Sequence, residues 1–508
     1  MAMKEAFNAS TTEDVALEHM GYQQEFKRSF GLLDMVGFSF SIVTCWTALS
    51  GVFIIGVEAG AMAEMCSRWP VAGGQYSWVA MLAPPRVSRQ LSYITGWFML
   101  IGILAMGAVN NSVGSNFILG QANLIFPDFV IERWHTVLVA WAVGLFALAV
   151  NIFAPHALHR LSRIILLWNI ASFIIVIITL LATNKQKQPA SFVFHDFRNM
   201  TGLGTAMATI VGILQSFFGM CCYDAPSHMT EEMTHASRDA PRAIVLSVLM
   251  GAVTGFVFLL TLCFCMGDIG STAGSTTGVP VIQIFYDSTR SKVGTCFLAS
   301  LITVIVIVAS VSLVAEGSRS VYAFARDHGL PFSALWSKVE PKRKIPVYSI
   351  VLTLVVQLAL NAIYFGTVTG FNTIVSLATT GFYVSYGLAL FSRLLGYFFG
   401  HQTSSFEGSS YSLPLPVSLG FNAIGLVFLL FASITFNFPS GAPVTSESMN
   451  YTSAAIGLVT LLSIVTWFTT ARKRFTGPSD VRNIILEGVE SPSALGAETY
   501  SKESTEIK

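Results

Sequence analysis

The chain has 508 residues, of which 53% are hydrophobic and 11% are charged, and its formal net charge is +1. A soluble protein of this length needs more charged surface, and near-neutrality with one short basic run, 472–474, argues against a nucleic-acid or other polyanionic partner. We therefore expect an integral membrane protein, which the mean hydropathy of +0.63 supports.

The first 30 residues are polar and lack the apolar core and cleavage site of a signal peptide. We expect residues 1–30 to form a cytoplasmic tail. A transmembrane domain over 31–473 and a second cytoplasmic tail over 474–508 are expected to follow.

Eleven apolar stretches are long enough to cross the bilayer, because ~20 residues in a helix span ~30 Å of hydrocarbon. We expect helices, since a barrel would show short alternating strands. In chain order the stretches cover 34–64, 93–120, 134–154, 164–182, 203–223, 243–267, 295–317, 346–365, 369–392, 413–437 and 451–470. The sequence thus predicts an all-α polytopic membrane protein.

Lys and Arg residues avoid these stretches and gather on alternate loops. Of the 29, 17 lie on one set of loops and 6 on the opposite set, with the rest in the tails. Because cytoplasmic loops are rich in Lys and Arg, the first set is expected to face the cytoplasm. Two Asn-x-Thr glycosylation sequons, at Asn199 and Asn450, fall on the other side, where such a modification occurs.

The basic residues that flank the first stretch do not fit a single membrane crossing. Lys27 and Arg28 precede it and Arg68 follows it, so both flanks favour the cytoplasm and an even number of crossings is required. Two crossings and a turn need roughly 45 residues at ~20 per crossing, whereas 34–64 supplies 31. A re-entrant hairpin, a translocated N-terminus or missing residues would each explain this, and we favour missing residues.

Three motifs stand at the cytoplasmic ends of predicted spans. The front motif is Ala63-Glu-Met-Cys-Ser-Arg-Trp-Pro-Val-Ala-Gly-Gly-Gln-Tyr-Ser-Trp78. The central motif is Ser216-Phe-Phe-Gly-Met-Cys-Cys-Tyr-Asp-Ala-Pro-Ser-His-Met-Thr-Glu-Glu232, followed by Ser237-Arg-Asp-Ala-Pro-Arg-Ala-Ile244. The rear motif is Gly317-Ser-Arg-Ser-Val-Tyr-Ala-Phe-Ala-Arg-Asp-His-Gly-Leu-Pro331.

With these motifs, the chain resembles the amino acid–polyamine–organocation superfamily from about residue 25 to 475, and looks most like its fungal amino acid/choline transporter branch, which includes choline and GABA permeases. The resemblance implies a five-plus-five inverted-repeat, LeuT-like bundle of twelve spans, with substrate bound where spans 1 and 6 unwind. In such carriers the broken helices expose backbone groups that hold a polar solute. The superfamily also has a complete second span before the front motif, which agrees with the crossing that the charge count finds missing.

The resemblance places substrate-binding candidates in the two interrupted spans. They are Ser41, Thr44, Trp46 and Thr47 in span 1, and Phe217, Phe218, Gly219 and Tyr223 in span 6. Phe218 and Tyr223 are expected to offer aromatic faces to an amine. The other interpretation of the Gly, Ser and Thr residues of span 1 is close helix packing.

Asp224, Asn169 and Glu316 are candidates for gating or proton coupling. A carboxylate at membrane depth predicts function, but Asp224 also suits an interfacial acid that begins a cytoplasmic loop, and we favour that role over direct substrate contact. For Glu316 we expect an ion pair with Arg319 or Arg326. Asn169 and its neighbour Trp168 are the polar features of span 5, which lacks the lysine that replaces sodium in some members of the superfamily.

The chain is expected to be a secondary transporter of amino acids, GABA, choline or a related amine, driven by the proton gradient, as is general among fungal plasma-membrane relatives. An ATP-driven pump needs a phosphate-binding loop and a membrane enzyme needs clustered catalytic side chains, and the sequence has neither. We expect no cofactor and no metal site. The alternatives are a nutrient sensor, an inactive truncated permease or an exporter of an amine-containing metabolite, in the plasma membrane or an internal one.

Overall fold

The computed structural model describes residues 17–18, 20–22, 24–26, 28–42, 52–196, 199, 201–367, 369–400, 406, 408–439, 441–445, 449–475 and 477. In this part of the chain the regular secondary structure is helical, and it forms two isolated β-bridges but no β-strand. The expectation of an all-α polytopic protein is confirmed.

Nine helical segments are long and apolar enough to cross a membrane, counted over the described ranges alone. Their principal helices are α5 (Pro85–Ile125), α6 (Arg133–Phe153), α7 (Leu158–Thr183), α11 (Ala236–Cys265), α14 (Lys292–Arg326), α16 (Val347–Gly366), α17 (Thr369–Phe398), α18 (Leu415–Thr435) and α19 (Thr452–Thr466). The shorter helices are α2 (Leu32–Ile42), α3 (Val52–Arg68), α4 (Gln75–Leu82), α8 (Ala190–Phe194), α9 (Thr205–Phe218), α10 (Ala225–His228), α12 (Ile269–Ala273), α13 (Pro280–Thr289), α15 (Ser333–Trp336) and α20 (Arg472–Arg474).

Two of the eleven predicted stretches are not continuous helices. The stretch 203–223 holds α9, which stops at Phe218, and the stretch 34–64 is divided between α2 and α3. At 1.5 Å per residue, α9 is about 21 Å long, short of the ~30 Å of a bilayer core. These two stretches are the ones in which an interrupted span was expected.

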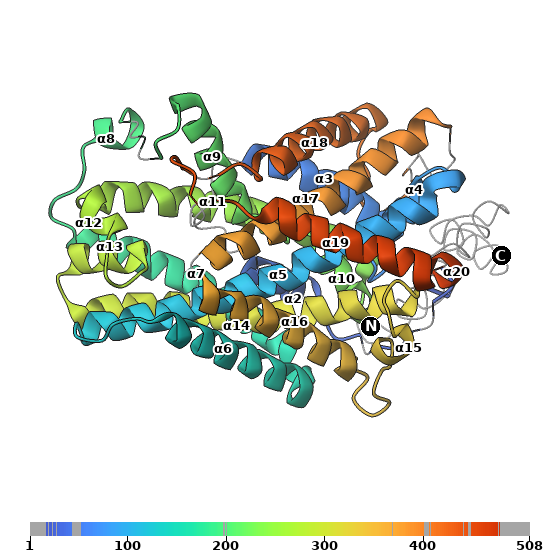
Figure 1. Cartoon of the computed structure of the whole chain (residues 1–508), viewed down its shortest axis with the longest axis horizontal. Coiled ribbons are helices and arrows are strands. Elements are labelled where there is room, and N and C mark those ends of the chain that lie inside the picture. The colour runs from blue at the N-terminus through green and yellow to red at the C-terminus, as the bar shows by residue number, and fades with distance from the viewer. Residues whose placement is uncertain are drawn as a thin grey trace, which may run out of the picture.

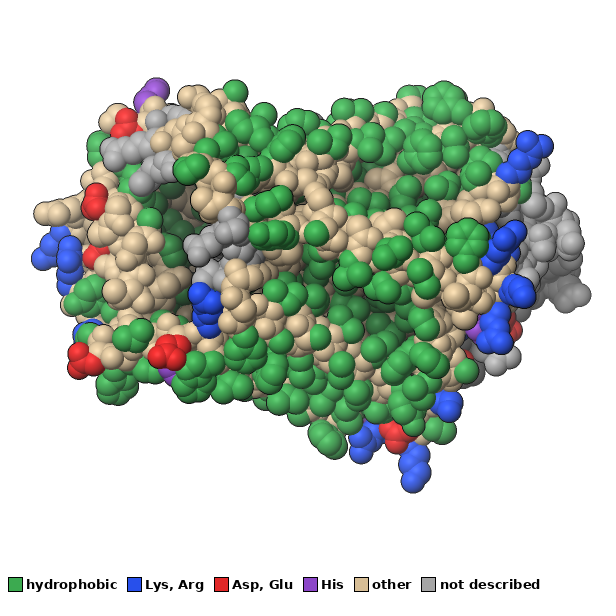
Figure 2. All heavy atoms as spheres, in the orientation of Figure 1, with side chains coloured by type: hydrophobic (Ala, Val, Ile, Leu, Met, Phe, Trp, Pro, Cys, Tyr) green, Lys and Arg blue, Asp and Glu red, His purple; other side chains and the backbone are tan. Residues whose placement is uncertain are grey.

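The long helices lie side by side, with short elements at both ends of the bundle. Figure 1 shows α15 and α20 at one end, and α8, α12 and α13 at the other. In Figure 2, hydrophobic side chains cover the middle of the visible face, and Lys and Arg side chains gather toward the ends. We call the end with α15 and α20 the basic end, because its loops carry the excess of Lys and Arg that marks the cytoplasm.

Helices α5, α14 and α17 form the interior of the bundle. In each of them most of the apolar stretch is buried inside the protein, whereas α6, α7, α16, α18 and α19 expose most of theirs. Polar side chains face inward from α5, where they find partners on other helices. Asn110 donates to the Val306 carbonyl at 2.9 Å, and Asn111 donates to Gln357 at 3.2 Å.

The closest approach of two interior helices is at a pair of glycines. A Cβ atom added to Gly381 in α17 would lie 2.7 Å from the Cα of Gly102 in α5. A Cβ atom on Gly102 would lie 2.9 Å from the amide nitrogen of Phe382. Small residues at this crossing are therefore required for α5 and α17 to pack.

The stretch 30–67 enters and leaves the bundle at one end. At its beginning, the amides of Ser29 and Phe30 donate to the Glu232 carbonyl, at 2.8 and 3.1 Å. At its end, the Ser67 hydroxyl donates to the Ser237 carbonyl at 3.0 Å. Helices of 11 and 17 residues are about 16 and 26 Å long, and residues 43–51 between them lie outside the described residues. The three explanations offered by the sequence therefore stay predictions.

The glycine crossing generates a stability prediction. Gly381→Ala places a methyl group against the backbone of α5, and we expect it to lower the free energy of unfolding by about 1–3 kcal/mol. Thermal unfolding of the detergent-solubilised protein measures the loss. The control is Gly420→Ala in α18, where an added Cβ meets no atom within 4 Å. Equal melting temperatures for the two variants would contradict the proposed crossing.

Candidate functional site

The polypeptide leaves its helical path between α9 and α10. Helix α9 ends at Phe218, residues 219–224 form turns, and α10 begins at Ala225. Cys222 has a φ of 66°, a left-handed conformation that costs a non-glycine residue about 1–2 kcal/mol. Pro226 follows in the first turn of α10 and has no amide hydrogen to continue α9. This segment, which we call the helix break, therefore interrupts the helical hydrogen-bond pattern inside the protein.

Asp224 ends the helix break and is completely buried. Gln75 Nε2 donates to its Oδ2 at 2.5 Å, and the Tyr386 hydroxyl donates to its Oδ1. His228 Nε2 lies 3.1 Å from the same Oδ2. Three elements, α4, α10 and α17, thus meet at one carboxylate. The interpretation of Asp224 as an interfacial acid is wrong, because burial inside the bundle removes it from the surface.

The contacts of His228 determine where a proton is needed. Its Nδ1 lies 3.1 Å from the Ala72 carbonyl, which can only accept, so Nδ1 carries a hydrogen. In a neutral ring Nε2 is then an acceptor that faces a carboxylate oxygen. A favourable contact between Asp224 and His228 therefore requires one more proton, held by the imidazole or by the carboxyl group.

The front motif builds one wall of this site. Gly74 has a φ of 55°, and a Cβ atom there would lie 2.7 Å from His228 Cε1. Only glycine provides both the left-handed backbone and the space. Ala72 and Gln75, on either side of this Gly-Gly pair, contact His228 and Asp224.

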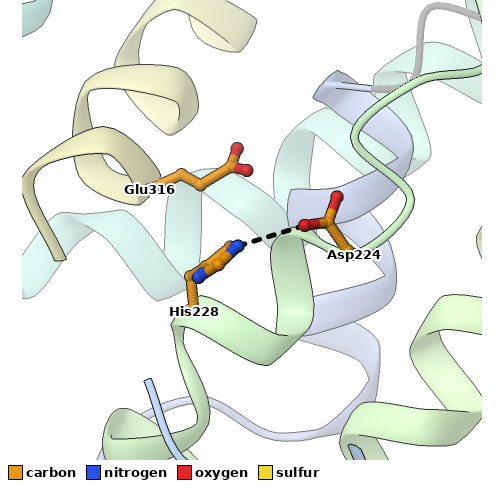
Figure 3. A group of neighbouring side chains, drawn as sticks. All are labelled: Asp224, His228 and Glu316. Carbon is orange, nitrogen blue, oxygen red and sulfur yellow. Dashed lines mark hydrogen bonds and ion pairs between the residues drawn. The ribbon is translucent and has the colours of Figure 1, made fainter. Parts of the chain in front are cut away.

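Glu316 completes a group of three buried ionisable side chains. Figure 3 shows its carboxylate turned toward Asp224 and His228, and the ligand atoms of the three all lie within 4.8 Å of one another. Neither Glu316 oxygen has a hydrogen-bond partner among the described residues. The expected ion pair with Arg319 or Arg326 is wrong, because these arginines bind Glu232 and Glu231 instead.

The group of Asp224, His228 and Glu316 has a donor set suited to a proton or a small cation. Two carboxylates and one imidazole, with Nδ1 of the ring bonded to a backbone carbonyl, also fit a divalent metal ion. A proton, a small cation and a divalent metal ion all require the negative charge of the two acids and the acceptor at Nε2.

A cavity of about 240 Å³ opens beside the helix break. Phe218, Gly219 and Cys221 line it from the break, and Asn169 lines it from α7. The cavity wall is otherwise mostly apolar, and Asn169 Oδ1 has no partner among the described residues. The structure thus brings together three of the predicted site residues, Phe218, Gly219 and Asn169.

Tyr223 and Glu58 meet on another side of the break. Both are buried, and the Tyr223 hydroxyl donates to Glu58 Oε2 at 3.2 Å. The resemblance implies an external position for the residue at Glu58, whereas in the structure α3 places it in the interior.

Beyond the group of three, ion pairs close the basic end. Arg319 Nε lies 2.7 Å from Glu232 Oε1, and Arg326 binds Glu231 through both terminal nitrogens at 2.9 and 3.1 Å. The N-terminal segment covers them, with Gln24 donating to the Glu231 carbonyl at 2.8 Å. The described residues 20–22, 24–26 and 28–30 are therefore packed against the bundle.

Asp327 anchors the N-terminal segment to the rear motif. It accepts from the Tyr22 hydroxyl at 3.0 Å and from the Tyr76 hydroxyl at 2.9 Å. Burial raises the pKa of the Asp327 carboxyl, while the nearby Arg326 and the two tyrosine donors oppose the rise. With these three partners, the buried Asp327 fixes the positions of Tyr22 and Tyr76 relative to the rear motif.

For several predicted site residues the structure describes no side chain. Thr44, Trp46 and Thr47 fall outside the described residues, and Ser41 and Phe217 belong to α2 and α9 without described side chains. At the sequons, Asn199 donates to the Leu203 carbonyl and Asn450 to the Phe436 carbonyl, both at 2.5 Å. Glycosylation at these two positions stays a prediction.

His228, Gln75 and Tyr386 were missed as site residues. His228 had a local signal, because a residue four positions after Asp224 lies on the same face of a helix. Gln75 and Tyr386 had none, since they are 149 and 162 residues away from Asp224 in the chain.

Comparison with known proteins shows consistent matches along the chain. The family model described as "Amino acid permease" matches residues 30–461. A putative amino acid/polyamine transporter of Macrophomina phaseolina is 57% identical, covering 83% of this chain and 97% of that protein. The amino-acid permease BAT1 of Arabidopsis thaliana is 27% identical over 93% of this chain and 96% of its own length. The choline transporter of Saccharomyces cerevisiae is 27% identical, over 90% and 84%.

The ion pairs at the basic end generate a second stability prediction. Glu232→Gln leaves the buried Arg319 without its carboxylate, and we expect the free energy of unfolding to fall by about 3–5 kcal/mol. Glu340→Gln is the control, because Glu340 is partly exposed and lies 4.0 Å from Arg343. That change should cost about 1 kcal/mol or less. Thermal unfolding in detergent compares the two, and similar losses would show that the buried pair has no special role.

Proposed function

The chain belongs to the amino acid permease family of membrane transporters, and from this premise we propose that it couples the movement of a small amine-containing solute to the proton gradient. Transport, and not enzymatic catalysis, follows from the family. The coupling ion and the solute are the proposed part. The chemistry that the relatives' names share is a positively charged nitrogen, an ammonium group in amino acids and polyamines and a quaternary ammonium in choline.

The observation that carries the proposal is the proton requirement at the helix break. Asp224 and His228 need one proton between them, and Glu316 lies within 4.8 Å with no other partner. When that proton leaves, two carboxylates are left close together in a medium of low dielectric constant, and their repulsion rises steeply. Loss of the proton would therefore favour a different arrangement of α4, α10, α14 and α17.

The cavity gives the solute a place beside this group. It is lined by the helix break, and a solute bound there would contact Phe218, Gly219 and Asn169. Movement of the break on protonation would change the cavity and its access together. Binding and proton transfer would then be linked through the one segment that they share.

One observation favours a second candidate, an inactive permease. The stretch 34–64 has 31 residues, fewer than the roughly 45 that two crossings and a turn need at ~20 residues per crossing. The alignment with the permease BAT1 also extends over 522 positions, more than the 508 residues of this chain, so that protein has residues that this chain lacks. Absence of uptake for amino acids, γ-aminobutyrate and choline in a transport-deficient host at every pH would favour this candidate.

A plasma-membrane location fits import of an external amine, and it is part of the proposal. A fluorescent fusion of the full chain, compared with surface and vacuolar markers, measures it. Signal confined to an internal membrane would favour movement of an amine between compartments.

Proton coupling predicts the behaviour of Asp224→Asn. The amide cannot exchange a proton in this range, so uptake should fall by about tenfold or more, the effect of one hydrogen bond to a charged group. Uptake by the unchanged protein should rise as external pH falls from about 7.5 to about 5, because external protons drive the proposed coupling, and the variant should lose this dependence. Radiolabelled uptake in a transport-deficient host measures both.

Other groups around Asp224 must be considered in this experiment. The titratable side chains that face or influence it are His228, Glu316, Tyr223, Tyr386, Cys66, Cys221 and Cys222. Glu64→Gln is the control, because Glu64 lies on α3 in a separate contact with α18. Unchanged pH dependence in Asp224→Asn would remove Asp224 from the coupling mechanism.

A further inference from the structure

We propose that Asp224, His228 and Glu316 bind a divalent transition-metal ion of the Zn²⁺ class, which joins α10 to α14 and holds the helix break in the arrangement described here. The metal site goes beyond the proposed function and departs from the expectation of no metal site. Its effect on uptake, an inhibition by added metal, rests on the proposed function.

Two of the ligands stand one helical turn apart at α10. Asp224 is the N-cap of that helix and His228 is its last residue, so their side chains lie on the same face. His228 Nε2 and Asp224 Oδ2 are 3.1 Å apart. A tetrahedral metal ion with bonds of about 2.1 Å places neighbouring ligand atoms about 3.4 Å apart. The pair therefore already has nearly the spacing that one ion requires.

Glu316 is the third ligand, and it comes from a different helix. Its side chain is completely buried, and neither carboxylate oxygen has a hydrogen-bond partner in the described part of the chain. Figure 3 shows it turned from α14 toward Asp224 and His228, with the ligand atoms of all three within 4.8 Å of one another. Closing that distance to the spacing around one ion needs a shift of roughly 1.4 Å at most. A buried carboxylate without a partner is costly, and a bound cation would remove that cost.

The charge of the group favours a divalent ion over a single proton. Its two carboxylates carry two negative charges when ionised, and one proton leaves one of these charges buried without compensation. The arginines of the rear motif, Arg319 and Arg326, bind Glu232 and Glu231 instead. An ion of charge +2 makes the group neutral, which removes the cost of an uncompensated buried charge.

The neighbours of the two α10 ligands hold them in position for a metal. His228 Nδ1 lies 3.1 Å from the Ala72 carbonyl, so the ring presents Nε2 to the ion. Gln75 and Tyr386 donate to the two oxygens of Asp224. An ionised carboxylate has about four lone-pair sites, so the two donors leave Oδ2 able to bind a metal. Metal ligands in proteins are commonly oriented by hydrogen bonds of this kind.

The donor types determine which metals fit. Mg²⁺ and Ca²⁺ prefer oxygen ligands throughout, whereas an imidazole nitrogen suits Zn²⁺, Co²⁺ and Ni²⁺. Zn²⁺ accepts one nitrogen and two oxygens from the protein and keeps a fourth position open. Because such an ion is bonded to both α10 and α14, the helix break cannot move relative to α14 while the ion is bound.

The binding experiment uses the purified full chain in detergent, without a histidine tag and after treatment with a chelator. Melting temperature as a function of ZnCl₂ concentration gives the dissociation constant, and MgCl₂ is the comparison. The visible absorption of added Co²⁺ reports the coordination geometry. We expect one tightly bound ion per chain, stabilisation by Zn²⁺ and none by Mg²⁺.

The variants remove ligands from different helices. Glu316→Gln breaks no described hydrogen bond, and His228→Gln keeps a donor for the Ala72 carbonyl. Each should weaken Zn²⁺ binding by about 100-fold or more, since losing a residue that only supports a ligand already costs 10–100-fold. The control is His195→Ala, an exposed histidine beside Asp196, which should bind Zn²⁺ like the unchanged protein.

The melting temperature in chelator reports whether each variant is folded. Equal Zn²⁺ affinity in the unchanged protein and both ligand variants would overturn the inference, as would equal stabilisation by Mg²⁺ and Zn²⁺. The same loss of affinity in His195→Ala would assign the ion to the surface and overturn it too.

Uptake into proteoliposomes separates the inference from the proposed function. A saturating concentration of ZnCl₂ on both sides of the membrane should abolish uptake of radiolabelled amino acids, γ-aminobutyrate or choline, and a chelator should restore it. Zn²⁺ binding that depends on Glu316, with no uptake of any of these solutes, would support the metal site and reject the proposed function. Uptake that depends on pH but is unchanged by Zn²⁺ would overturn the inference and leave proton coupling in place.

Discussion

The structure depends on one constraint, that a backbone group inside a bilayer must find its hydrogen-bond partner within the protein. Residues 219–224 interrupt the helical hydrogen-bond pattern, and residues 220–224 are buried inside the protein, which shields them from lipid. The same shielding removes water, so every charge placed near the break interacts strongly. A helix that simply continued through Asp224 would have neither this interruption nor a cluster of buried acids.

The three motifs converge on this break although they are far apart in the chain. The front motif supplies Ala72, Gly74 and Gln75, and Glu316 stands immediately before the rear motif. The ion pairs of Glu231 and Glu232 follow on the same segment toward the basic end. Residues that line the cavity, residues of the group of three and the two acids of the ion pairs thus lie on one continuous stretch, 218–232. Displacement of that stretch would alter all three together.

The stretch that holds α2 and α3 is the part of the chain that differs from what the resemblance implies. Its two ends contact residues 232–237, so it is attached to the segment that follows the break. From α3, Glu58 lies inward and accepts a hydrogen bond from the Tyr223 hydroxyl.

Hydropathy by itself determined the membrane class and the helical spans, because ~20 apolar residues admit few other structures in lipid. It also indicated that 34–64 was too short, and Asp224 was a candidate from its depth alone. Tertiary structure decided which side chains contact one another. Helix periodicity specifies a face, but which faces meet depends on the packing of helices more than a hundred residues apart. For that reason Tyr386 and Gln75 were not foreseen, Glu316 turned toward Asp224 and away from Arg319, and Glu58 proved to be buried.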